Sequence, residues 1–116
     1  MSYNDVSQLS GRDPVLKSAA ISIAGMGDNT VVAAVTGQRV KVMHLSLFTS
    51  GAVNVQVKSG AGTNLTGAFT FLANQGWAFD AAGGNKAMMT TAGDALVVNL
   101  SAAVTVTGYV QFFQEA

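Results

Sequence analysis

The chain has 116 residues with one proline, no cysteine and 49% hydrophobic residues, which indicates a single domain with a core large enough to fold without metal or disulfide staples. The absence of cysteine excludes disulfides, thiolate metal sites and a cysteine nucleophile. Six basic and six acidic residues cancel to a net charge of zero, so the chain has no field that would steer it onto nucleic acid or an anionic membrane.

The first fourteen residues are polar and show no apolar periodicity. They lack the apolar run of a secretory signal, and no later stretch approaches the ~18 uninterrupted apolar residues of a membrane span. We therefore predict an extended N-terminal arm over residues 1–14 and one domain over residues 15–116. The protein is expected to be soluble, neither exported by the usual signal nor membrane-spanning.

From Val15 onward, β-branched and aromatic residues recur at every second position between clusters of Gly, Asn, Asp and Ser, and helix patterns are nearly missing. The predicted strands cover residues 19–24, 30–36, 39–48, 52–58, 67–73, 77–79, 96–100 and 104–112. Residues 81–92 are predicted to form a loop that enters a strand. About eight short strands at this spacing are typical of an all-β, antiparallel sandwich or a small barrel.

In residues 39–48, the apolar residues shift from even-numbered to odd-numbered positions. Val40 and Val42 share one parity, whereas Met43, Leu45 and Leu47 share the other. The pattern predicts either a β-bulge near Val42 or a strand that is covered on both faces.

Candidate catalytic residues are few. His44 is the only histidine, which rules out a multi-histidine metal site, and its place inside a strong strand favours a structural role. The acidic residues are scattered, and a glycosidase would need two of them, such as Asp80 and Asp94, to meet across a cleft. Most of these acids lie beside turn glycines or in the arm, and the better explanation for Asp28 and Asp94 is that Asx side chains close turns by hydrogen-bonding to their own backbone. We therefore predict no catalytic residue, no cofactor and no metal site in a protein that is not an enzyme.

Two further patterns have both a functional and a structural interpretation. Residues 60–64 are glycine-rich like a phosphate loop, but they have no P-loop lysine and no following helix, which favours a flexible hairpin. The aromatic residues are spaced as in a carbohydrate-binding platform, although core or interface packing is the commoner reason for such spacing. These residues are Trp77, Phe79, Tyr109, Phe112 and Phe113.

Only 10% of the residues are charged, against about 25% in average soluble domains. A neutral surface this poor in charge promotes association, which predicts that the protein works inside an assembly as a homo-oligomer.

Several runs resemble the small β-sandwich virion proteins encoded beside capsid genes in tailed bacteriophages. They are VVAAVTGQRVKV at 31–42, VQVKSG at 55–60, LTG at 65–67, GDALVVNLS at 93–101 and VTGYV at 106–110. The resemblance implies a jelly-roll-like decoration or cement protein, made in the host cytoplasm, that binds the outside of the capsid and locks neighbouring capsomers together. Its implied partners are the major capsid protein and copies of itself, as a trimer or dimer.

Two other roles are compatible with the sequence: another virion part such as a fibre or tail module, and a carbohydrate-binding sandwich.

The arm is the predicted partner contact, because a polar segment can become ordered on a partner through backbone hydrogen bonds and a few anchors. Its anchors would be Tyr3, Val6 and Leu9, with Arg12 and Asp13 as charge partners at the rim. The alternative is a frayed terminus without a role.

Overall fold

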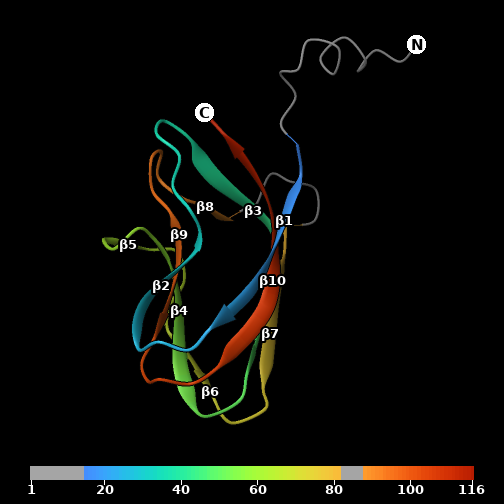
Figure 1. Cartoon of the computed structure of the whole chain (residues 1–116), viewed down its shortest axis with the longest axis vertical. Helices are drawn as coiled ribbons and strands as arrows, with labels where there is room; N and C mark the ends of the chain where they lie inside the picture. Colours follow the sequence, from blue (N-terminus) through green and yellow to red (C-terminus); the bar gives the residue numbers. More distant parts are fainter. Residues whose placement is uncertain (1–14, 82–87) are drawn as a thin grey trace, which may run out of the picture.

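The fold consists of two antiparallel sheets packed face to face (Figure 1). The computed structural model describes residues 15–81 and 88–116, and the predicted arm lies outside the described residues. The strands are β1 (Lys17–Ile23), β2 (Gly27–Val32), β3 (Arg39–Thr49), β4 (Val53–Ser59), β5 (Thr63–Asn64), β6 (Phe69–Phe71), β7 (Gly76–Asp80), β8 (Met88–Met89), β9 (Leu96–Leu100) and β10 (Val106–Glu115). Sheet A has the order β1-β10-β3-β7, with β8 also on β3, and sheet B has the order β2-β9-β4-β5, with β6 also on β4.

The strands pair in a nested order. Apart from the two-residue strands β5 and β8, strands from the two ends of the chain pair in sequence towards its middle. The pairs are β1 with β10, β2 with β9, β3 with β7, and β4 with β6. This nesting is that of a jelly roll, a long antiparallel hairpin rolled up so that its pairs alternate between two sheets. The all-β, antiparallel, jelly-roll-like sandwich predicted from the sequence is confirmed.

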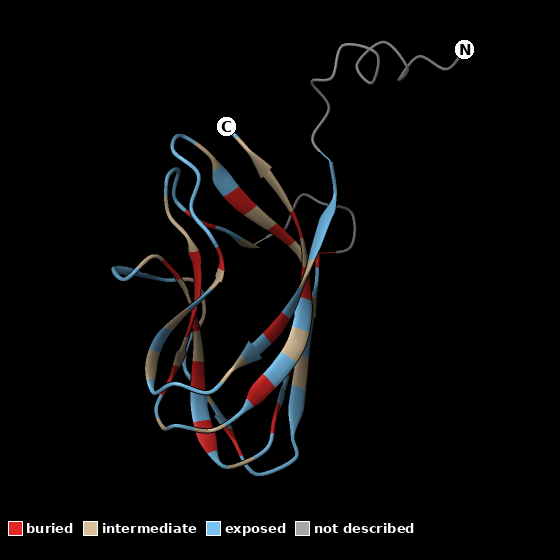
Figure 2. Ribbon diagram, in the orientation of Figure 1, coloured by how far each residue is buried: buried red, intermediate tan, exposed pale blue. Residues whose placement is uncertain are grey.

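The core lies between the two sheets and is formed by every second residue of the long strands. Buried and exposed residues alternate along β10 in Figure 2. Leu45 of β3, Val55 of β4, Val98 of β9 and Val110 of β10 are completely buried in one hydrophobic cluster. Each such side chain stabilises the fold by about 1.5–3 kcal/mol relative to an exposed position.

The predicted bulge is present in β3. Gln111 of β10 pairs with His44, whereas Phe112 pairs with Val42, so Met43 is the extra residue. Because one added residue reverses the alternation, both Val42 and Leu45 face the core.

Several strand limits differ from those predicted. Residues 27–29, which precede the predicted strand 30–36, begin β2, because Gly27 and Asp28 pair with Leu100 and Asn99 of β9. Residues 33–36 lie outside the strand and are exposed. The short β5 had no strand pattern of its own, while Met88–Met89 is the strand expected after the loop in 81–92. The differences arise because pairing with a neighbouring strand decides where a strand ends, and the sequence does not display that neighbour.

Gly108 provides a test of the packing within sheet A. A Cβ built at this position would overlap the carbonyl oxygen of Ser46 in the adjacent β3. We expect Gly108→Ala to lower the free energy of unfolding by about 2–4 kcal/mol, because two central strands would have to move apart. Gly67→Ala is the matched control, since a Cβ there meets no atom within 4 Å, and it should change stability by less than about 0.5 kcal/mol. Urea denaturation of both variants measures the difference, and equal stabilities would contradict the close approach.

Candidate interaction surface

The outer face of sheet A carries a nearly uncharged area, which we call the A face. Strand register arranges it in three rows that each cross β7, β3, β10 and β1. The rows are Gly76, Phe48, Thr107 and Ser22; Ala78, Ser46, Tyr109 and Ala20; and Asp80, His44, Gln111 and Ser18. Asp80, at one corner, is the only acidic residue among them, and none is Lys or Arg.

Two large rings are exposed on the A face, contrary to the usual inward placement of aromatic residues. Phe48 is 51% exposed and Tyr109 is 42% exposed. The ring of Phe48 lies against Gly76, where a Cβ would come within 2.8 Å of the Phe48 Cδ1 atom. The ring of Tyr109 stacks on His44, with centroids 4.9 Å apart and an angle of 22° between the planes. Each ring thus has one face against a neighbouring residue of sheet A and leaves the rest of its surface in water.

Apart from Asp80, the charged groups of this side of the molecule lie beyond the three rows. Lys41 pairs with Phe113 and Arg39 pairs with Glu115, at the end of sheet A past the bulge. Besides the two rings, His44 and Asp80, the three rows contain only serine, alanine, threonine, glutamine and glycine. A partner would thus displace water from the rings without having to desolvate many ions.

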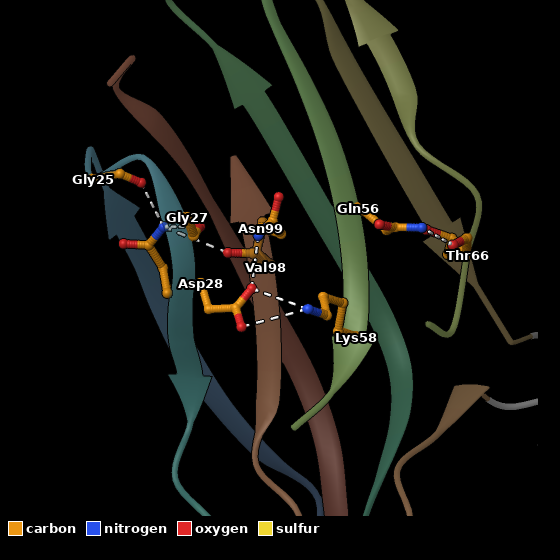
Figure 3. Close-up of polar contacts among 9 residues, drawn as sticks. Gly25, Gly27, Asp28, Gln56, Lys58, Thr66, Val98 and Asn99 are labelled. Atoms are coloured by element: carbon orange, nitrogen blue, oxygen red, sulfur yellow. Dashed lines mark hydrogen bonds and ion pairs between the residues drawn. The ribbon is translucent and has the colours of Figure 1, made fainter. Parts of the chain in front are cut away.

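The outer face of sheet B has a different character, because its polar side chains bind one another (Figure 3). The ammonium of Lys58 lies 3.2 Å from the nearer carboxylate oxygen of Asp28, and Asn99 Nδ2 donates to that same oxygen at 2.7 Å. Lys58 belongs to β4 and Asp28 to β2, so the lysine side chain crosses the intervening β9. The hydrogen bond from Asn99, with a further contribution from Lys58, holds the pKa of Asp28 below its usual value.

His44 and the two acids considered for catalysis are separated by the fold. His44 and Asp80 are register partners on the A face. Asp94 precedes β9 of sheet B, and its Oδ2 accepts a hydrogen bond of 2.8 Å from the Ser59 hydroxyl, which itself accepts one from the Thr91 N–H. The acid pair Asp80 and Asp94 is thus divided between two sheets, and Asp94 has a structural role in the turn before β9.

The glycine-rich segment at residues 60–64 is a hairpin between β4 and β5, as the sequence favoured. Gly60 has a positive φ of 58°, and its N–H donates to the carbonyl of Ala95 at 2.9 Å. Asp94 packs against Gly60, where a Cβ would come within 3.2 Å of the carboxyl carbon. The glycine thus serves the turn and the contact between two loops of sheet B.

The five aromatic residues that are spaced as in a carbohydrate-binding platform do not lie on one surface. Trp77 and Phe79 are register partners of the buried Leu47 and Leu45 and point into the sandwich, where Trp77 packs on Phe69 of the other sheet with ring centroids 4.7 Å apart. Phe112 is buried in the core as well. Tyr109 reaches the A face, and Phe113 lies on the same side beyond the bulge.

The sequence analysis did not identify Phe48 as an exposed residue of a candidate surface. The available signal was its parity after the bulge, opposite to that of Leu45 and Leu47.

The remaining sequence predictions concern metals, membranes and the arm. In residues 15–81 and 88–116, no three His, Asp or Glu side chains are grouped as metal ligands. No helix in the same residues is long and apolar enough to cross a membrane. The predicted anchors of the arm, Tyr3, Val6, Leu9, Arg12 and Asp13, lie outside the described residues.

The Asp28 network predicts a specific acid sensitivity. Because the folded state lowers the pKa of Asp28, its stabilising contribution is complete above the ordinary aspartate pKa of about 4 and disappears as the pH falls through the lower, folded value. Asp28→Asn should therefore flatten the acid limb of a plot of Tm against pH, while costing less than about 1 kcal/mol at neutral pH for this exposed pair. Lys58→Met, which keeps an aliphatic stem over β9, should flatten the limb only in part. An unchanged acid limb in Asp28→Asn would show that another carboxylate is responsible.

Comparison with known proteins identifies the fold. No protein-family model matches the chain, and no curated protein matches it significantly. Among solved structures, a similar chain comes from the work "Bacillus endospore appendages form a novel family of disulfide-linked pili", with a TM-score of 0.50 and 14% sequence identity over 89% of this chain and 88% of that one. At this identity the likeness shows a shared sandwich fold.

Proposed function

We propose that this protein is a non-enzymatic structural subunit that binds other proteins through the A face, and that it decorates the outside of a bacteriophage capsid as a cement protein. The observation that carries the proposal is the pair of exposed rings of Phe48 and Tyr109, each packed against a neighbouring residue, in a nearly uncharged area. Exposed aromatic residues with few ions around them are typical of the centre of a protein interface.

The contrast between the two outer faces supports this choice of surface. On sheet B, Lys58 and Asn99 already donate to the carboxylate of Asp28, so a partner would gain little from these groups. On sheet A, the exposed rings gain free energy whenever a partner removes them from water, by about 25 cal/mol per Å² of apolar surface.

The size of the A face supports a partner that offers many repeated sites. The three rows, each with one residue from each of four strands, cover roughly 400 Å². This area follows from a spacing of about 4.8 Å between strands and about 6.8 Å between successive side chains on one face of a strand. A stable interface buries about 800 Å² on each partner. One A face alone should therefore bind weakly, and occupancy of a large assembly such as a capsid would be reinforced when several faces engage together.

A capsid partner also agrees with the low charge content and with the resemblance to small phage virion proteins. The interacting groups would be neutral, so binding would depend little on ionic strength. The major capsid protein would then be the main partner, with the protein on the capsid exterior.

A fibre or tail module is the second candidate, and the structural neighbour favours it. The appendages from which that neighbour comes are described as pili, so a sandwich of this fold is found in a fibrous assembly. Those pili are described as disulfide-linked, whereas this chain has no cysteine, and its own assembly would have to rest on non-covalent contacts.

Placing a charge on the A face tests the proposal. Tyr109→Lys and Phe48→Lys should each weaken binding to purified capsids at least tenfold, about 1.4 kcal/mol, because an ammonium would be buried in place of a ring. Thr70→Lys, at an exposed position on β6 of sheet B, is the matched control and should bind as the unchanged protein does. Co-sedimentation with capsids lacking the protein measures binding. Full binding by both ring variants would exclude the A face, and binding to glycans but not to capsids would favour the carbohydrate-binding alternative.

The location of the protein is tested independently by quantitative mass spectrometry of purified virions. We expect abundance in fixed proportion to the major capsid protein, because a cement protein occupies every equivalent site of a symmetric shell. A few copies per particle would favour a fibre or tail module instead.

A further inference from the structure

We propose that two copies of this chain pair through the edges of their β1 strands, in antiparallel orientation about a two-fold axis, so that their A sheets join into one continuous sheet. The pairing rests on the properties of β1 itself. Its consequence for partner binding, given below, rests on the proposed function.

The edge of β1 is unpaired and open in the part of the chain that the structure describes. β1 is an edge strand of sheet A. It pairs on one side only, with β10, in an unbroken register over Lys17–Ile23. The hydrogen bonds among the described residues include none, besides those of this ladder, to the backbone of β1. The strand contains no proline or glycine, and its residues after Lys17 are uncharged. Such an edge is a template for another strand.

The other sheet edges carry features that oppose pairing. β2 contains the carboxylate of Asp28 and a register shift between Thr30 and Val32. β7 begins with Gly76 and ends with the exposed Asp80. β5 and β6 are two and three residues long. Charges, irregularities and short length are the usual protections of edge strands, and β1 has only Lys17 at its first position.

The sequence of β1 suits antiparallel pairing with itself. If Ala20 lies opposite the partner's Ala20, then Ser18 lies opposite the partner's Ser22, and Ala19 lies opposite the partner's Ile21. Serine thus meets serine on the outer face of the joined sheet, and the apolar side chains of Ala19 and Ile21 meet on the inner face. Lys17 lies opposite the partner's Ile23, so the two lysines are at opposite ends of the pair and do not repel each other.

This pairing enlarges the A face. A two-fold axis perpendicular to the sheet keeps both outer faces on the same side, so the two sets of Phe48 and Tyr109 rings share one surface. The joined area of roughly 800 Å² reaches the size of a stable interface on one partner, which a single A face does not. The dimer would therefore be the unit that binds a capsid.

A charge-swap experiment tests the pairing. Ala20 lies on the two-fold axis, so Ala20→Lys places two ammonium groups opposite each other, and Ala20→Glu does the same with carboxylates. Sedimentation velocity of the full chain across the micromolar range should show a dimer for the unchanged protein and at least tenfold weaker dimerisation for either variant alone. An equimolar mixture of the two variants should form the mixed dimer, because opposite charges then face each other.

The matched control is Ala78→Lys, in the same row of the A face but on β7 at the other edge of sheet A. It should dimerise as the unchanged protein does, and circular dichroism should show that every variant is folded. Dimer-dependent protection of the Ser18–Ser22 amides from hydrogen exchange would place the contact at β1.

A monomer throughout the micromolar range, a trimer, or a dimer weakened equally by Ala78→Lys and Ala20→Lys would overturn the proposal. These measurements use the free protein without capsids. A β1 dimer whose ring variants still bind capsids would exclude the A face as the capsid contact and leave the pairing intact, and a β1 dimer that binds no capsid would refute the capsid role alone. Capsid binding by a strict monomer would refute the pairing alone.

Discussion

The pairing of β3 with β10 is the contact on which the rest of the structure depends. These two strands occupy the middle of sheet A and run side by side from Val106 opposite Thr49 to Glu115 opposite Arg39. Their backbones approach so closely at Gly108 that no side chain fits against Ser46. The bulge at Met43 then decides which side chains of β3 face the core and which face outward. Through this one irregularity, Leu45 and Leu47 are buried while His44 and Phe48 reach the A face.

The two sheets share a core, but their outer surfaces differ in charge and in exposed apolar area. On sheet B, Asp28, Lys58 and Asn99 bind one another across three strands. On sheet A, stacking of Tyr109 on His44 and packing of Phe48 against Gly76 hold apolar rings in water. The second arrangement has an unfavourable hydration free energy unless a partner covers it, which is the physical basis of the proposed structural role.

The same scarcity of charge affects the strand edges. Natural sheets usually protect their edges with charged residues, and a chain with only 10% charged residues has few to use for that purpose. The edge strands β2 and β7 have Asp28 and Asp80, while β1 from Ser18 to Ile23 has no charged residue. An open edge and an uncovered face on one sheet are what we expect of a subunit that is completed by its neighbours.

The sequence by itself determined the class of fold, because alternation at every second residue follows directly from the geometry of a strand and is visible in any segment that buries one face. It also indicated the bulge, since the change of parity between Val42 and Leu45 is a local signal, and it showed through composition that the protein is poor in charge. The limits of β2, the existence of β5, and the inward direction of Trp77, Phe79 and Phe112 were decided by the tertiary structure. So was the assembly of Phe48, Tyr109, His44 and Gly76 into one surface, because these residues come from three strands far apart in the chain, and only the pairing of those strands brings their side chains onto the same face.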